Sequence, residues 1–233
     1  MTGMLASVNS VEEAALVLSA NVDIIDLKQP ALGALGALEI DLVKRIVAEI
    51  NGRRPVSATI GDLPMQPEIV YHAVKAMAET GVDYVKIGFF PDGDWLGTVK
   101  KLSALTQAAP ATNIALIAVL FADAQPDLSI IAALKNAHFK GVMLDTMDKK
   151  NGSLTQVMAK ADIAQFVSLA KAHRLICGLA GSLRLENIPE LMPYQPDYLG
   201  FRGALCLQHN RTARLSEHSV ALIKRAIAHA DTT

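Results

Sequence analysis

The chain has 233 residues and a formal net charge of -1, with 51% hydrophobic and only 5% aromatic residues. A nearly neutral chain gives no electrostatic reason to expect nucleic acid or an anionic membrane as a partner. The many aliphatic residues favour parallel strands buried beneath helices. Because the net charge is close to zero, any site for an anionic ligand must be formed by a local group of residues.

Short apolar runs alternate with longer amphipathic segments along the chain, which predicts alternating strands and helices. The expected strands are Met4–Val8, Ile24–Lys28, Val56–Ile60, Tyr84–Gly88, Ile114–Leu120, Gly141–Asp145, Leu175–Ala180 and Tyr198–Arg202. The expected helices are Val11–Ala20, with Ser10 as N-cap, Ile40–Ile50, Glu68–Thr80, Leu96–Ala108, Leu128–Ala137, Ala161–His173, Leu185–Leu191 and Ser216–Ala230. Eight such units favour a single closed (β/α)8 TIM barrel over residues 1–233.

An open doubly wound sheet is the structural alternative. Gly33 and Gly36 follow the second expected strand, but their spacing is not that of the dinucleotide fingerprint. The histidines are not spaced as a set of metal ligands. We therefore expect neither a nicotinamide or other cofactor nor a bound metal.

The two cysteines, Cys177 and Cys206, stand in apolar or strand-end settings. This usage fits a reducing compartment better than a disulfide-bonded scaffold. No signal-peptide pattern and no run of about 18 apolar residues is found in the sequence. We expect a soluble, cytoplasmic protein that has no membrane or nucleic-acid partner and forms a homo-oligomer through its apolar helix faces.

Two lysines at strand ends are the central clue to function. Asp26 and Lys28 stand two residues apart on the second strand, so their side chains share a face. Lys86 has an equivalent place on the fourth strand. In a buried cavity, desolvation and a second cation lower the pKa of a lysine, and its neutral amine can form a Schiff base. The structural alternative for each lysine is a stem packed on apolar surface with its ammonium in solvent, or a static ion pair.

Other polar residues also stand where the barrel strands should end, which is where such barrels carry their chemistry. They are Thr59, Asp62, Asp123, Asp145, Ser182 and Arg202. Asp145 could hold an ammonium or move protons, and its alternative role is an N-cap or a static ion pair. Lys149, in the loop that follows Asp145, could reach over the barrel mouth.

The last two loops suit a phosphate group. Gly181 and Ser182 follow the seventh strand, and Arg202 and Gly203 follow the eighth. Backbone amides beside glycine, a hydroxyl and a guanidinium all donate hydrogen bonds to phosphate. In phosphate-handling barrels, these two loops are the usual binding place.

Six segments, taken in order, resemble the (5-formylfuran-3-yl)methyl phosphate synthase family of methanofuran biosynthesis. They are Asp23–Lys28, Val56–Asp62, Asp83–Gly88, Met143–Thr146, Leu179–Arg184 and Gly200–Ala204. The resemblance implies a (β/α)8 lyase that condenses two glyceraldehyde 3-phosphate molecules into a furan aldehyde phosphate, releasing phosphate and water. No single segment is specific, but the ordered set spans nearly the whole chain.

By this resemblance, Lys28 matches the lysine that forms the Schiff base and Lys86 matches the proton acceptor. Asp26, Asp145 and Lys149 match supporting positions, and the loops after strands seven and eight would bind phosphate.

The sequence departs from the family pattern in two loops. Met147–Gly152 leaves open whether Lys149 or Lys150 takes the family role. Leu205–Arg211 lacks the expected glycines, which could place part of the phosphate contact on Arg202 or Arg211.

The residues alone leave two alternative functions open. One is a simpler class I aldolase acting on sugar phosphates, which would stop at the open-chain adduct. The other is a non-catalytic barrel that binds a phosphorylated metabolite.

Overall fold

The computed structural model describes residues 1–107 and 115–231 of the chain. Eight parallel strands pair in chain order, and β1 pairs with both β2 and β8, so that the sheet closes. The strands are β1 (Gly3–Val8), β2 (Ile24–Leu27), β3 (Val56–Thr59), β4 (Tyr84–Phe89), β5 (Ala115–Phe121), β6 (Gly141–Asp145), β7 (Ile176–Leu179) and β8 (Tyr198–Phe201). The predicted (β/α)8 barrel is confirmed.

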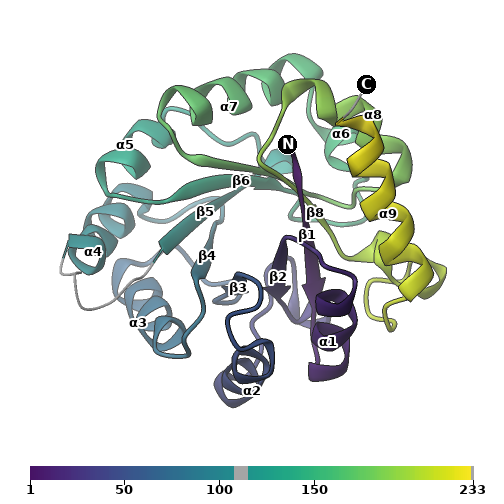
Figure 1. Ribbon diagram of the computed structural model, residues 1–233. Coiled ribbons are helices and arrows are strands. Elements are labelled where there is room, and N and C mark those ends of the chain that lie inside the picture. The colour runs from purple at the N-terminus through teal and green to yellow at the C-terminus, as the bar shows by residue number, and fades with distance from the viewer. Residues whose placement is uncertain (108–114, 232–233) are drawn as a thin grey trace.

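The helices form an outer ring around the sheet, and α9 closes the ring beside α1 (Figure 1). They are α1 (Val11–Ser19), α2 (Ile40–Ile50), α3 (Pro67–Ala78), α4 (Trp95–Gln107), α5 (Ile130–Asn136), α6 (Leu154–Val157), α7 (Lys160–Ala172), α8 (Ile188–Leu191) and α9 (Glu217–Ala230). The predicted N-cap is confirmed, because the Ser10 side chain accepts a hydrogen bond from the Glu13 amide. The predicted helix end at Ala108 and strand start at Ile114 lie outside the described residues.

The core has two parts. The larger part packs the outer face of the sheet against the helices. The smaller part fills the barrel interior, with Leu5, Ile24, Ile117, Val119 and Met143 among its members. Because alternate residues of a strand share a face, the interior residues that follow Leu5 and Ile24 are Ser7 and Asp26, paired across β1 and β2. A polar layer therefore lies directly above an apolar one.

No helix within residues 1–107 and 115–231 is long and apolar enough to cross a membrane. Over the same ranges, no group of three or more His, Cys, Asp or Glu side chains is placed to hold a metal ion. The compartment and the self-association of the chain stay predictions.

Candidate active site

A cavity of about 520 Å³ opens at the carboxyl ends of the strands. The predicted site residues that line it are Lys28, Lys86, Asp145, Lys149, Gly181, Ser182, Arg202 and Gly203. Asp26 is fully buried and pairs with Lys86 at the cavity wall. The barrel thus brings together residues from both halves of the sequence.

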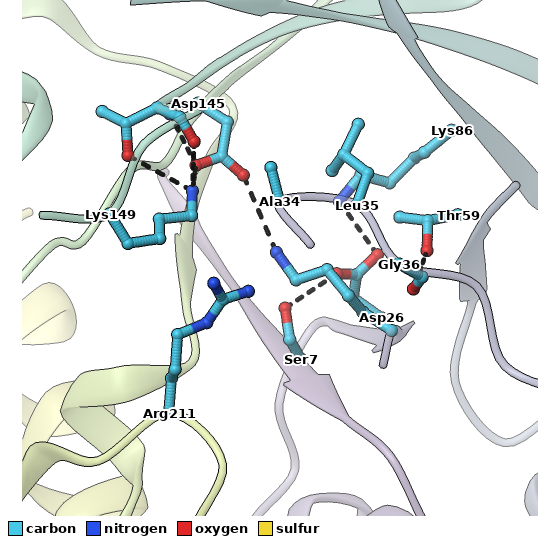
Figure 2. Close-up of polar contacts among 12 residues, drawn as sticks. Ser7, Asp26, Ala34, Leu35, Gly36, Thr59, Lys86, Asp145, Lys149 and Arg211 are labelled. Carbon is cyan, nitrogen blue, oxygen red and sulfur yellow. Dashed lines mark hydrogen bonds and ion pairs between the residues drawn. The ribbon is translucent and has the colours of Figure 1, made fainter. Parts of the chain in front are cut away.

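Asp26 is the centre of a buried polar cluster. Its carboxylate accepts hydrogen bonds from Ser7 Oγ at 2.7 Å and Lys86 Nζ at 2.9 Å (Figure 2). It also accepts one from Ser57 Oγ at 2.6 Å. Burial by itself would raise the pKa of Asp26, but the ammonium groups of Lys86 and Lys28 outweigh burial and hold that pKa below its ordinary value. Asp26 therefore remains a carboxylate that fixes the position of the Lys86 amine.

Lys28 follows the last residue of β2, and its amide donates to Val8 O at 3.0 Å, which extends the strand pairing by one step. Only 6% of the residue is exposed. Its amine lies 3.7 Å from Asp145 Oδ2, which is too far for a good hydrogen bond. Burial lowers the pKa of Lys28 to about 8, and the charges of Lys149 and Lys86 add to this effect while Asp145 opposes it. This amine therefore loses its proton more readily than an exposed lysine does.

Asp145 ends β6 and faces two amines. Lys149 Nζ lies 2.5 Å from its Oδ1 atom and also donates to the Thr146 carbonyl. Burial alone would raise the pKa of Asp145, but the ammonium groups of Lys149 and Lys28 hold it well below its ordinary range. Lys150 is exposed, and in the described chain its side chain reaches no acid. The geometry thus favours Lys149 over Lys150 as the amine above the barrel mouth.

The loops after β7 and β8 line the cavity with residues whose amides are unpaired. Gly181 has φ of +110°, and a Cβ there would lie 2.8 Å from Thr146 Cγ2, so the position requires glycine. Within the described chain, the N–H groups of Gly181, Ser182 and Gly203 donate no hydrogen bond to protein. These amides and the Ser182 hydroxyl have the chemistry that an anion requires, and the phosphate contact stays a prediction.

Arg202 follows β8 and lines the cavity as the sequence suggested, but its guanidinium is engaged within the protein. Its five N–H groups donate to Glu13 twice and to the carbonyls of Ser7, Arg211 and Ala213. The ion pair with Glu13 is buried on both sides. The guanidinium therefore has no donor left for phosphate, which argues against the predicted side-chain contact.

Three strand-end residues that the sequence grouped with the site instead hold loops. The Asp62 carboxylate accepts from the amides of Ala34 and Leu35 at 2.8 and 2.7 Å. Asp123 does the same for the loop after β6, and Thr59 Oγ1 donates to Gly36 O at 3.0 Å. These three side chains therefore hold loop backbone in place and do not line the cavity.

Sequence reasoning missed Ser7, Ser57 and Glu13, and it singled out Arg211 only as one of two options. The two serines pair with Asp26 across neighbouring strands, so a known strand register would have found them. Glu13 gives no such signal, because it lies on α1 and its partner is far away in the sequence.

The chain is similar to known proteins over nearly its whole length. The family model described as 4-HFC-P synthase matches residues 4–224. A Methylorubrum extorquens protein with the provisional name (5-formylfuran-3-yl)methyl phosphate synthase is 40% identical over 94% of this chain and 88% of its own length. A Methanocaldococcus jannaschii protein named (5-formylfuran-3-yl)methyl phosphate synthase is 33% identical, covering 87% of this chain and 89% of its own.

Among solved structures, 3-hexulose-6-phosphate synthase from Salmonella typhimurium has a similar fold. The TM-score is 0.71, at 14% sequence identity and with coverage of 98% of this chain and 100% of that chain. This likeness concerns the barrel alone. The family model and the relatives, in contrast, extend over the strands that carry the cavity residues, and the chain belongs to the 4-HFC-P synthase family.

Proposed function

We propose that this synthase condenses two molecules of glyceraldehyde 3-phosphate into (5-formylfuran-3-yl)methyl phosphate through a Schiff base on Lys28. The observation that carries the proposal is a buried amine with a pKa of about 8 in a cavity that also holds a second amine and an acid. The names of the relatives supply the product class. By atom balance, the reaction releases one phosphate and two waters.

The first step is attack of the neutral Lys28 amine on the aldehyde carbon. The carbinolamine then loses its hydroxyl as water, which needs a proton donor. Lys86 suits this task, because it lines the same cavity and its ammonium is paired with Asp26 at 2.9 Å. Once it has given up this proton, Lys86 is a neutral amine beside the imine.

The second step is removal of a proton from the carbon next to the imine, whose acidity the imine raises. Neutral Lys86 takes this proton and restores its ion pair with Asp26. The electron pair left behind forms an enamine, which can expel phosphate or attack the second aldehyde. Ring closure with loss of two waters then gives an aromatic furan, which makes the late steps favourable. Hydrolysis of the imine takes up the water released when it formed, and this frees the product aldehyde and the Lys28 amine.

Asp145 and Lys149 serve the departing groups. Asp145 stays ionised and holds the Lys149 ammonium at 2.5 Å, at the edge of the cavity. An ammonium there stabilises negative charge that develops on a hydroxyl or phosphate oxygen. The free amides of Gly181, Ser182 and Gly203 hold the phosphate of the bound substrate.

Incubation of the purified protein with glyceraldehyde 3-phosphate tests the proposal. We expect a furan absorbance band to appear together with one equivalent of inorganic phosphate. An open-chain aldol product with no furan band would identify a class I aldolase instead, and a bound but unchanged substrate would identify a binding protein.

A further inference from the structure

We propose that Arg211 binds the phosphate of the second triose phosphate, the molecule that is not attached to Lys28. This inference rests on the proposed function. The reaction takes two phosphorylated aldehydes, and the glycine loops after β7 and β8 provide amides for one phosphate. The second anion needs its own cationic partner in the same cavity.

Arg211 is a cavity cation with unused hydrogen-bonding capacity. One N–H of its guanidinium donates to Gly33 O at 2.8 Å, and within the described residues the side chain makes no other hydrogen bond. No carboxylate of the described chain lies within 4.0 Å of it, so it forms no ion pair there. The planar group can therefore offer paired donors to a phosphate.

The other cations of the inner cavity are already paired. Lys86 pairs with Asp26, Lys28 and Lys149 share Asp145, and Arg202 pairs with Glu13. Arg184 also lines the cavity, but within the described chain no hydrogen bond joins its side chain to the loop that follows Lys28, as one does for Arg211. Arg211 is left as the cation for an anion elsewhere in the cavity.

The position of Arg211 suits the second molecule. The residue lies in the segment after β8, and its bond to Gly33 O carries the guanidinium across to the loop that follows Lys28. Figure 2 shows the side chain pointing toward Asp145 and Lys149. A phosphate held there would belong to an aldehyde lying on the β2 side of the cavity, beside the Lys28 adduct.

The segment that carries Arg211 is fixed before any ligand arrives. Arg202 donates to Arg211 O at 2.8 Å and to Ala213 O at 3.0 Å, and Glu13 accepts from the Leu215 amide at 3.2 Å. A guanidinium on a fixed backbone loses less entropy when it binds. The saturated Glu13–Arg202 pair thus acts as the support for Arg211.

Two measurements on the full chain test this inference, each made on Arg211→Ala and Arg211→Lys. Arg214→Ala is the control, because it removes an exposed guanidinium from the same segment outside the cavity. The first is borohydride trapping of glyceraldehyde 3-phosphate on Lys28 as a function of concentration. The second is steady-state formation of the furan. Melting temperatures show whether each variant is folded.

We expect Arg211→Ala to leave the glyceraldehyde 3-phosphate concentration that half-saturates trapping within about 2-fold of the wild-type value. The same variant should lower kcat/KM for furan formation by about 100-fold, the scale of two charge-assisted hydrogen bonds. Arg211→Lys should lie between this variant and the wild type, and Arg214→Ala should match the wild type. Equal losses in trapping and turnover, or no loss in either, would overturn the role of Arg211. Absence of trapping in the wild type would instead reject the proposed function itself.

Discussion

Two buried acid–base clusters of this barrel differ in how completely they are paired. In the Glu13–Arg202 cluster, all five guanidinium N–H groups donate, and the carboxylate also accepts from the amides of Asn9 and Leu215. In the other, a single carboxylate, Asp145, faces both Lys28 and Lys149. Lys28 lies at 3.7 Å without a hydrogen bond to that acid.

This difference distinguishes a charged side chain that holds the fold together from one that can react with a ligand. A saturated ion pair holds backbone in place and offers nothing to a ligand. A buried amine that shares its acid with a second amine keeps a lowered pKa and a free nitrogen. Arg202 and Lys28 both stand at a strand end, but the guanidinium has a partner for every N–H group, whereas the Lys28 amine makes no hydrogen bond to its acid.

Replacing Lys28 with Arg should have the largest effect. Arginine keeps the positive charge but cannot form the imine, so furan formation should fall by at least ~10⁴-fold, as when other covalent nucleophiles are removed. Steady-state turnover measures this. Lys150→Arg is the matched control, because Lys150 is exposed on the rim, and it should retain wild-type activity. Surviving turnover in Lys28→Arg would contradict the imine role.

Asp145→Asn removes the acid from the reactive cluster and should lower kcat by about 10³-fold, because the Lys149 ammonium loses its anchor. The carboxylate normally raises the pKa of Lys28, so its loss should move that pKa below about 8. The pH profile of imine formation should then shift toward acid. A profile that stayed in place would show that Asp145 does not act on Lys28.

Glu13→Gln breaks the saturated cluster by leaving the Arg202 guanidinium buried without its counter-charge. Unfolding in urea should show a loss of about 3 kcal/mol in the free energy of unfolding. Glu12→Gln, on the exposed face of the same helix turn, is the control and should change little. A variant as stable as the wild type would mean that the pair contributes no net stability.

Lys149→Met tests the smallest expected effect, a change in the pH dependence of imine formation, which is separate from the loss of furan turnover expected when the ammonium near the departing groups is removed. The Lys149 charge lowers the pKa of Lys28, and without it Asp145 acts on Lys28 alone, so that pKa should rise above about 8. At pH 7 the neutral fraction of Lys28 falls, and imine formation should slow by about 10-fold if the pKa rises by one unit. Rapid-mixing measurements of imine formation across pH would show the midpoint; a shift toward acid would have the wrong sign.

The sequence predicted the barrel because every strand is a short apolar run followed by an amphipathic segment. It also predicted that Asp26 and Lys28 share a face, because side chains alternate along a strand. Lys28 and Lys86 line the same cavity, and Asp26 pairs with Lys86 at its wall. These features depend on local order alone.

The rest depends on contacts that cross the fold. The sequence assigned Arg202 to phosphate binding because it follows β8. In the structure its partner is Glu13 on α1, 189 residues away in the sequence. The spacing of residues along the sequence does not predict that pairing. Arg211 likewise gains its position from Gly33, 178 residues distant.

The central claim is that Lys28, among the buried amines of the cavity, is the one that attacks the aldehyde. Borohydride trapping with glyceraldehyde 3-phosphate followed by peptide mapping tests it most directly. We predict a single reduced adduct on Lys28, with a yield that rises with pH through about 8. An adduct on Lys86 or Lys149 in its place, or no adduct during furan formation, would contradict the account.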